Sequence, residues 1–174
     1  MKQKYKFYKH TPVYTARGLL ELCLTKYGDK EAFTYQNKKQ DVSVSFAEFK
    51  TQVYVFGTYL FNEGYNGGHI AVFGENSYEW ILTHFAVTCG GNVIVPIDKE
   101  LDAASIAELL QDSESKVLVY SNTYVDVVEQ LQATLPGMSY INMKDIPSMI
   151  EKGKALISEG CTDYLDVSVS KDDL

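Results

Sequence analysis

A lone glycine in residues 72–80 (VFGENSYEW) lies where an apolar run passes into a helical pattern, and phosphate-binding loops occur at such turns. Free N–H groups and the helix dipole favour an anion there. Dinucleotide loops, however, need G-x-G-x-x-G, and P-loops need Gly, Lys and Ser or Thr at fixed spacing. Gly74 has no partner glycine, and Glu75 brings a carboxylate to the position of a phosphate. We therefore interpret the stretch as a helix start, with Asn76 as N-cap and Glu79 completing a capping box.

Polar residues also follow two further apolar runs. In an open parallel sheet, ligands bind beyond the carboxyl ends of the strands. Here those positions are Gly74 to Asn76, Asp98 to Glu100, and Ser121 to Asn122. Turn formation and helix capping by Asp, Asn and Ser explain the same residues without a ligand, and we favour that explanation. The sequence therefore assigns no catalytic, cofactor-binding or metal-binding residue.

Histidine and cysteine offer no clear nucleophile or metal site. His84 and Cys89 share one predicted helix but are five residues apart, so they face different sides and local geometry does not pair them. The three cysteines, Cys23, Cys89 and Cys161, are odd in number and widely spaced, without a C-x-x-C pair. This pattern argues against a disulfide framework and against a zinc site.

Three aromatic residues on the same predicted helix, Tyr78, Trp80 and Phe85, admit two interpretations. They could form a platform on which a base stacks, or they could pack against the sheet. Core packing is favoured because large aromatic side chains dominate core burial.

Composition limits the class of protein. A chain of 174 residues with 45% apolar and 22% charged residues is long enough for one well-cored domain. The net charge of −7 argues against a general affinity for nucleic acid or anionic lipid. The basic patch of Lys2, Lys4, Lys6 and Lys9 is interpreted as part of an arm, residues 1–14, that lies on the protein. No apolar segment is long enough to span a membrane and no signal sequence is present, so we expect a cytoplasmic protein.

The first third of the chain predicts a helix, a hairpin and a second helix. Thr15 can cap a helix that ends near Tyr27, and EAFTYQ and VSVSF are typical of two hairpin strands. Ser45 and Glu48 form a capping box, after which apolar residues recur at alternating steps of three and four up to Leu60.

From His69 onward, the runs HIAVF, NVIVPI, KVLVYS and MSYINM recur at regular spacing and predict strands. Helical patterns between them would begin at Asn76, Asp102 and Asn122, which indicates βαβ units and a largely parallel sheet. The tail YLDVSVSKDDL is polar and shows no partner within the chain. The fold class is therefore α/β, a layered sheet preceded by a hairpin, in a single domain over residues 15–174.

The linear order of these segments resembles a known family. TARGLLELCLTKYGDKEAFTY, VSFAEFKTQVYVFGTYLFNEGY, HIAVFGENSYEWILTHFAVTCGGNVIVPIDKEL and KVLVYS together look like the N-terminal part of the adenylate-forming superfamily. Within that superfamily the chain is similar to AMP-forming acyl-CoA synthetases, particularly the long-chain fatty acid type. The resemblance covers nearly all of residues 15–174, and residues 74–101 carry most of it.

The resemblance implies a parent enzyme that uses ATP, Mg²⁺ and coenzyme A. Such enzymes activate a carboxylic acid as an acyl-adenylate, release pyrophosphate and transfer the acyl group to the thiol of coenzyme A. In the family, the Ser/Thr/Gly-rich phosphate loop follows a segment resembling SKDDL, which here ends the sequence at Leu174. No catalytic residue of the family can therefore be placed on this chain. The resemblance predicts an N-terminal scaffold that is inactive alone and whose expected partners are the rest of its AMP-binding domain and, in a homodimer, a second copy of the chain.

Two other hypotheses remain at this point. The first is a stand-alone α/β binding or interaction module without catalysis, which should be monodisperse, whereas a fragment should expose an apolar face and associate. The second is an unrelated flavodoxin-like or Rossmann-like binding protein, which copurifying flavin or nucleotide would reveal.

Overall fold

The computed structural model describes residues 10–37 and 39–172, so the lysines of the N-terminal patch lie outside the described residues. A helix, α1, precedes a β-hairpin and a long helix, α2, and alternating strands and helices follow. The elements are α1 (Ala16–Tyr27), β1 (Glu31–Asn37), β2 (Gln40–Ser45), α2 (Phe46–Asn62), β3 (His69–Phe73), α3 (Tyr78–Cys89), β4 (Val93–Ile97), α4 (Ala103–Asp112), β5 (Ser115–Tyr120), α5 (Val125–Thr134), β6 (Ser139–Asn142), α6 (Ile146–Ser158) and α7 (Asp163–Asp166).

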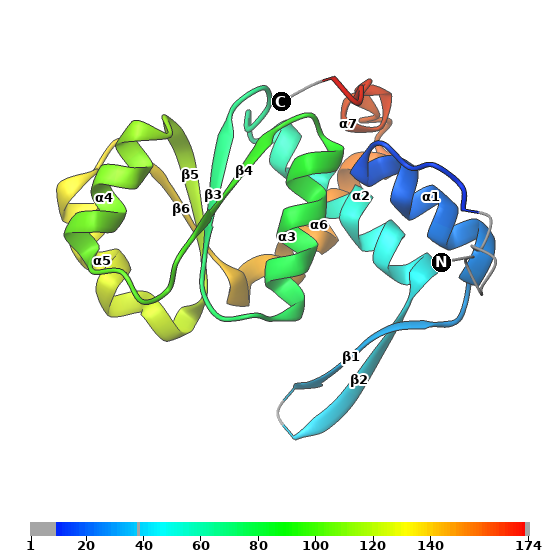
Figure 1. Ribbon diagram of the computed structural model, residues 1–174, viewed down its shortest axis with the longest axis horizontal. Coiled ribbons are helices and arrows are strands. Elements are labelled where there is room, and N and C mark those ends of the chain that lie inside the picture. The colour runs from blue at the N-terminus through cyan, green and yellow to red at the C-terminus, as the bar shows by residue number, and fades with distance from the viewer. Residues whose placement is uncertain (1–9, 38, 173–174) are drawn as a thin grey trace, which may run out of the picture.

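A four-stranded parallel sheet in the order β4-β3-β5-β6 forms the centre of the molecule. The hairpin β1-β2 is a separate antiparallel pair that projects from the body (Figure 1). Because β4 and β5 lie on opposite sides of β3, the chain reverses its direction across the sheet at β3. The predicted α/β class, with a largely parallel sheet and an N-terminal hairpin, is confirmed.

Side chains alternate between two cores along each strand. Ile70 and Val72 of β3 face the core formed with α2, α3 and α6, whereas Ala71 and Phe73 face the core formed with α4 and α5. Strands buried on both faces are typical of parallel sheets, since crossover helices cover both sides. This explains why HIAVF reads as a continuous apolar run rather than as an alternating one.

The predicted helix starts at Thr15, Ser45 and Asp102 are confirmed. The Thr15 Oγ1 accepts the N–H of Gly18 at 3.0 Å, and the Asp102 carboxylate accepts the N–H of Ser105 at 2.8 Å. Ser45 and Glu48 form the reciprocal capping box that the sequence predicted. Local hydrogen bonding therefore sets these three boundaries.

The predicted N-caps Asn76 and Asn122 are wrong by one and two residues, since the caps are Ser77 and Tyr124, and Glu79 does not complete a capping box. Ser77 is the N-cap of α3, and its Oγ accepts the N–H of Trp80 at 3.1 Å. After β5, the chain first makes a short 3-10 turn capped by Ser121, and α5 begins only at Val125. Adjacent Asn and Ser residues are equally good caps, so capping preference by itself does not select between them.

The C-terminal tail, for which the sequence predicted no partner, is anchored in the body. Tyr164 of α7 is only 2% exposed, and its Oη donates to the backbone oxygen of Ala86 at 2.9 Å. Its ring lies on two glycines: a Cβ at Gly57 would overlap the ring, and one at Gly90 would come within 2.6 Å of it. The sequence did not reveal this contact because Gly57 and Gly90, which leave room for the ring, are far from Tyr164 in the sequence and have no side chains.

Arg17 of α1 joins the tail to α3. Its guanidinium donates to the backbone oxygens of Leu165 and Val167, both at 2.8 Å, and of Tyr164 at 2.9 Å. A fourth hydrogen bond, of 2.7 Å, reaches the backbone oxygen of Cys89 at the end of α3. The cation thus satisfies carbonyl groups at the C-terminal ends of two helices, where the helix dipole favours positive charge.

The contact between Gly57 and Tyr164 predicts that Gly57→Ala destabilises the fold. The added methyl group must displace the Tyr164 ring, and overpacking of this kind costs about 1–3 kcal/mol of unfolding free energy. Urea denaturation followed by circular dichroism measures it. The matched control is Gly137→Ala, because nothing lies within 4 Å of a Cβ at Gly137. Equal stability of the two variants would contradict the packing.

The Arg17 contacts predict that Arg17→Met lowers the unfolding free energy by about 2–4 kcal/mol, since partly buried carbonyl groups lose a charged donor. The same denaturation measurement applies. Lys144→Met, at an exposed lysine, is the control and should change stability by less than about 0.5 kcal/mol. A loss at Arg17 no larger than at Lys144 would show that the tail is held by Tyr164 alone.

Candidate functional site

The carboxyl ends of β3 and β5 meet at the point where the strand order reverses, which is the usual ligand position in such sheets. Glu75 follows β3, and its Oε1 accepts the hydroxyl of Ser121 at 2.8 Å and that of Thr123 at 3.1 Å. Gly74 has a φ of +155°, and a Cβ there would lie 2.7 Å from the Cβ of Ser121. The two loops are therefore packed against each other and joined by a carboxylate.

Glu75 is held as a carboxylate. Burial by itself would raise its pKa, but hydrogen bonds from its own N–H, Ser121 and Thr123, together with the charge of Lys99, lower the pKa below its ordinary value. A negative charge therefore lies just beyond the carboxyl end of β3, where it would repel a nucleotide phosphate, and two hydroxyl donors are already used. The residues present do not fit the phosphates of ATP.

The other strand-end residues act in turns and links. The Asn142 Nδ2 donates to the Asn122 Oδ1 at 3.0 Å, which joins the ends of β5 and β6. Asp98 accepts the N–H of Glu100 at 3.0 Å, and both residues are exposed. The structure thus brings Glu75 and Ser121 together and leaves the Asp98–Glu100 segment at the surface.

Cys89 and His84 do not form a nucleophile pair. Cys89 is fully buried, and burial raises the pKa of its thiol to about 12, so the thiol stays protonated at neutral pH. Burial also lowers the pKa of His84, whose ring stacks on Trp80 with 5.7 Å between the ring centroids. Thiolate chemistry is therefore not supported at this helix.

The aromatic residues of α3 pack mainly against the protein. Tyr78 is 7% exposed and stacks on Tyr35 of the hairpin, with 4.9 Å between centroids and 6° between planes. Phe85 and Trp80 are half-buried against the same core. Tyr78 and Tyr35 thus fix the projecting hairpin to the body, which the sequence did not predict.

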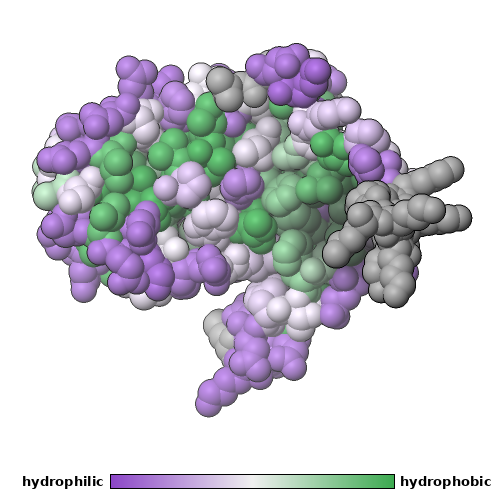
Figure 2. Space-filling view, viewed as in Figure 1, coloured by the Kyte–Doolittle hydropathy of each residue, from purple (hydrophilic) through white to green (hydrophobic). Residues whose placement is uncertain are grey.

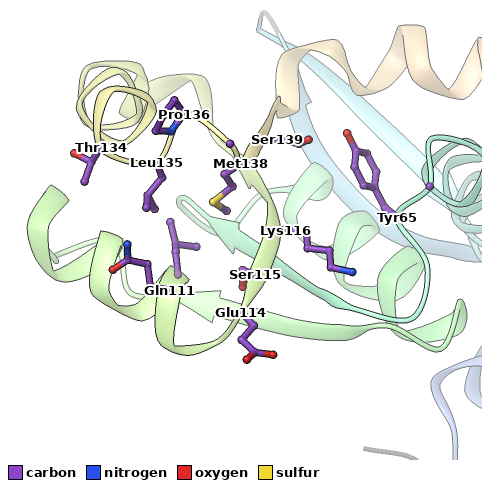
Figure 3. Close-up of a pocket in the computed structure, with 13 residues that line it drawn as sticks. Tyr65, Gln111, Glu114, Ser115, Lys116, Thr134, Leu135, Pro136, Met138 and Ser139 are labelled. Atoms are coloured by element: carbon purple, nitrogen blue, oxygen red, sulfur yellow. The ribbon is translucent and has the colours of Figure 1, made fainter.

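A cavity of about 650 Å³, shown in Figure 3, lies at the opposite, amino-terminal edge of the sheet. Leu110, Leu135 and Met138 contribute apolar side chains to its lining. In Figure 3, Tyr65 and Lys116 lie on the other side of the cavity from Leu135. Sequence reasoning missed it because its lining comes from the ends of α2, α4 and α5, none of which carries a motif. It holds no pairing of nucleophile and base among its lining residues.

Within residues 10–37 and 39–172, no group of three or more His, Cys, Asp or Glu side chains is arranged to hold a metal ion. No helix in the same part of the chain is long and apolar enough to cross a membrane.

The lowered pKa of Glu75 predicts a pH dependence that Glu75→Gln removes. A carboxylate with a depressed pKa stabilises the fold above its unfolded pKa, near 4.5, and this contribution is lost as the pH falls through the folded pKa. The stability of the native chain relative to Glu75→Gln should therefore decline from pH 6 towards pH 3. Denaturant titrations at several pH values measure it, and a constant difference over that range would show that Glu75 is not held ionised by these contacts.

Comparisons with curated proteins identify acyl-CoA ligases. The chain is 28% identical over 123 residues to a 2-methylpropanoate–CoA ligase of Humulus lupulus, covering 70% of this chain and 21% of the relative. It is 30% identical over 97 residues to a long-chain-fatty-acid–CoA ligase of Mycobacterium bovis, covering 55% of this chain and 16% of the relative. The chain thus spans about a fifth of the length of these relatives.

Solved structures share the fold. The N-terminal domain of FACL13 from Mycobacterium tuberculosis superposes with a TM-score of 0.76 at 22% identity, covering 92% of this chain and 40% of that chain. A fatty acyl CoA synthetase of Mycobacterium tuberculosis gives the same TM-score and identity, with 31% of that chain covered.

The family model for AMP-binding enzymes matches residues 20–173. This range includes both cores, the anchored tail and the switch point, which is the place beside Glu75 where the strand order reverses. The chain therefore belongs to the family of AMP-binding enzymes, as the resemblance of its segments predicted.

Proposed function

We propose that this chain is the N-terminal part of an AMP-forming acyl-CoA synthetase and serves there as a folded scaffold. The parent enzyme would convert ATP, a carboxylic acid and coenzyme A into acyl-CoA, AMP and pyrophosphate. The family match and the relatives' names support the reaction class, and a share of about a fifth of their length supports the role as a part. Residues 15–174 would form one domain of a cytoplasmic protein.

The observation that carries the proposal is the carboxylate at the switch point. The Oε1 of Glu75 accepts hydrogen bonds from Ser121 and Thr123, so the sheet edge where ligands usually bind is used to hold two loops of the fold together. ATP, Mg²⁺ and coenzyme A would then be bound by residues outside this chain. Its partner is the remainder of the same AMP-binding domain.

Self-association of the isolated chain is part of this proposal. Val93, Ile94 and Val95 of β4 are only partly buried, and the rest of the enzyme would cover what remains exposed. Apolar surface left open in this way favours contact between copies.

A stand-alone binding module is the second candidate, and one observation favours it. The helices of this chain cover both faces of the sheet, and Arg17 and Tyr164 close the structure at its C-terminal end. A domain that buries its own core in this way can fold by itself.

Carboxylate-dependent ATP–pyrophosphate exchange tests the scaffold role. The purified 174-residue chain, assayed with Mg²⁺, ATP and short-, medium- and long-chain carboxylates, should show no exchange above the protein-free background. A complete long-chain fatty acid–CoA ligase in the same assay is the positive control. Exchange that depends on the carboxylate and rises in proportion to the concentration of the chain would refute the proposal.

A further inference from the structure

Strand β4 forms one edge of the sheet and pairs only with β3 among the described residues. The N–H of Val93 donates to the backbone oxygen of Gly68 at 3.0 Å, so Val93 directs its backbone groups towards β3. Backbone groups of successive residues alternate in direction along a parallel strand. Val95 and Ile97 therefore also face β3, and Ile94 and Pro96 face away from the sheet.

The side chains of β4 are apolar and less completely buried than those of β3. Val93, Ile94 and Val95 are partly buried, with Ile94 and Val95 packed against the two cores, whereas the residues of β3 from Ile70 to Phe73 are at most 2% exposed. Figure 2 shows apolar surface gathered over the region where β4 and α4 lie. An edge with free backbone groups and apolar side chains is a template on which another strand can pair.

One residue makes this edge a poor template. Pro96 is exposed and carries no N–H, and the N–H of Asn92 already donates to the backbone oxygen of Val87 at 3.2 Å. Ile94 is therefore the sole outward donor between Asn92 and Pro96, whereas Asn92, Ile94 and Pro96 all offer outward carbonyl oxygens.

The strand that would pair with this edge is β4 of a second copy of this chain, because two identical edges are self-complementary in antiparallel pairing. Pairing centred on Ile94 would form two hydrogen bonds between the two copies of that residue. The next bonds would join the N–H at position 96 of one copy to the oxygen of Asn92 in the other, and the proline removes both of them. We propose that Pro96 restricts pairing of β4 with a second copy of this chain by withholding these two donors.

Replacement of Pro96 tests this inference. Pro96→Val and Pro96→Thr both restore the N–H and have almost the same shape, but only Val adds apolar surface. Each variant should associate at a concentration about ten-fold or more below that of the native chain, as expected for two added hydrogen bonds. Sedimentation velocity over a concentration series measures it. Pro136→Val, at an exposed loop proline, is the matched control and should behave as the native chain does.

Several results would overturn the inference. One is that the native chain and both Pro96 variants associate at the same concentration. Another is that Pro136→Val lowers the association concentration as much as the Pro96 variants do. A third is that Pro96→Val lowers it and Pro96→Thr does not. Circular dichroism checks that the variants fold. If the Pro96 variants do not fold, hydrogen exchange of the Ile94 amide in the concentrated native chain is measured instead. Fast exchange supports an unpaired β4 edge, and protection of this amide refutes the inference. This experiment measures association between copies of the chain, so its outcome is independent of the ATP–pyrophosphate exchange assay that tests the proposed function.

Discussion

The guanidinium of Arg17 is the interaction on which the closure of this structure depends. It donates to four backbone oxygens that belong to the end of α3 and to the tail around α7. Each of these carbonyl groups lies at or just beyond a helix C-terminus, where no intrahelical donor remains. A single cation thus supplies hydrogen-bond donors to the terminal carbonyl groups of two helices, α3 and α7, and places α1 beside them. It also lies 5.6 Å from the ring centre of Tyr54 and 5.7 Å from that of Tyr164, so aromatic faces cover it from water.

Glycines allow close packing at three places in this part of the fold. Tyr164 can reach the oxygen of Ala86 only because Gly57 and Gly90 leave room for its ring. In α6, a Cβ at Gly153 would overlap the backbone of Val55 in α2, so these two helices pack with almost no side chain between them. Glycines within helices cost helical stability, and here the packing of a large ring and of a second helix offsets that cost.

The switch point connects the fold with the proposed role. In this sheet, the reversal of strand order brings Glu75 beside Ser121 and Thr123, which gives the geometry of a ligand site but fills it with a carboxylate of the protein. The site therefore stabilises two loops instead of binding an anion. Membership of the family is compatible with a strand-end site that does not fit a phosphate, because this chain covers only a small share of its relatives.

The sequence by itself determined the elements whose signals are local. Alternating apolar steps, the capping box of Ser45 and Glu48 and the β-rich runs after His69 predicted the helices, the hairpin and the parallel sheet, because such signals act within a few residues. The order of these segments also indicated the family. Only the tertiary structure decided that Ser77 caps α3, that Arg17 and Tyr164 anchor the tail and that Glu75 closes the switch point. These contacts join residues separated by 46 to 150 positions, or depend on which side of a helix is buried. No local pattern encodes the long-range contacts, because the partners of Arg17 and Tyr164 are backbone oxygens and glycines that any sequence contains, and the hydroxyl partners of Glu75 lie on a distant strand end.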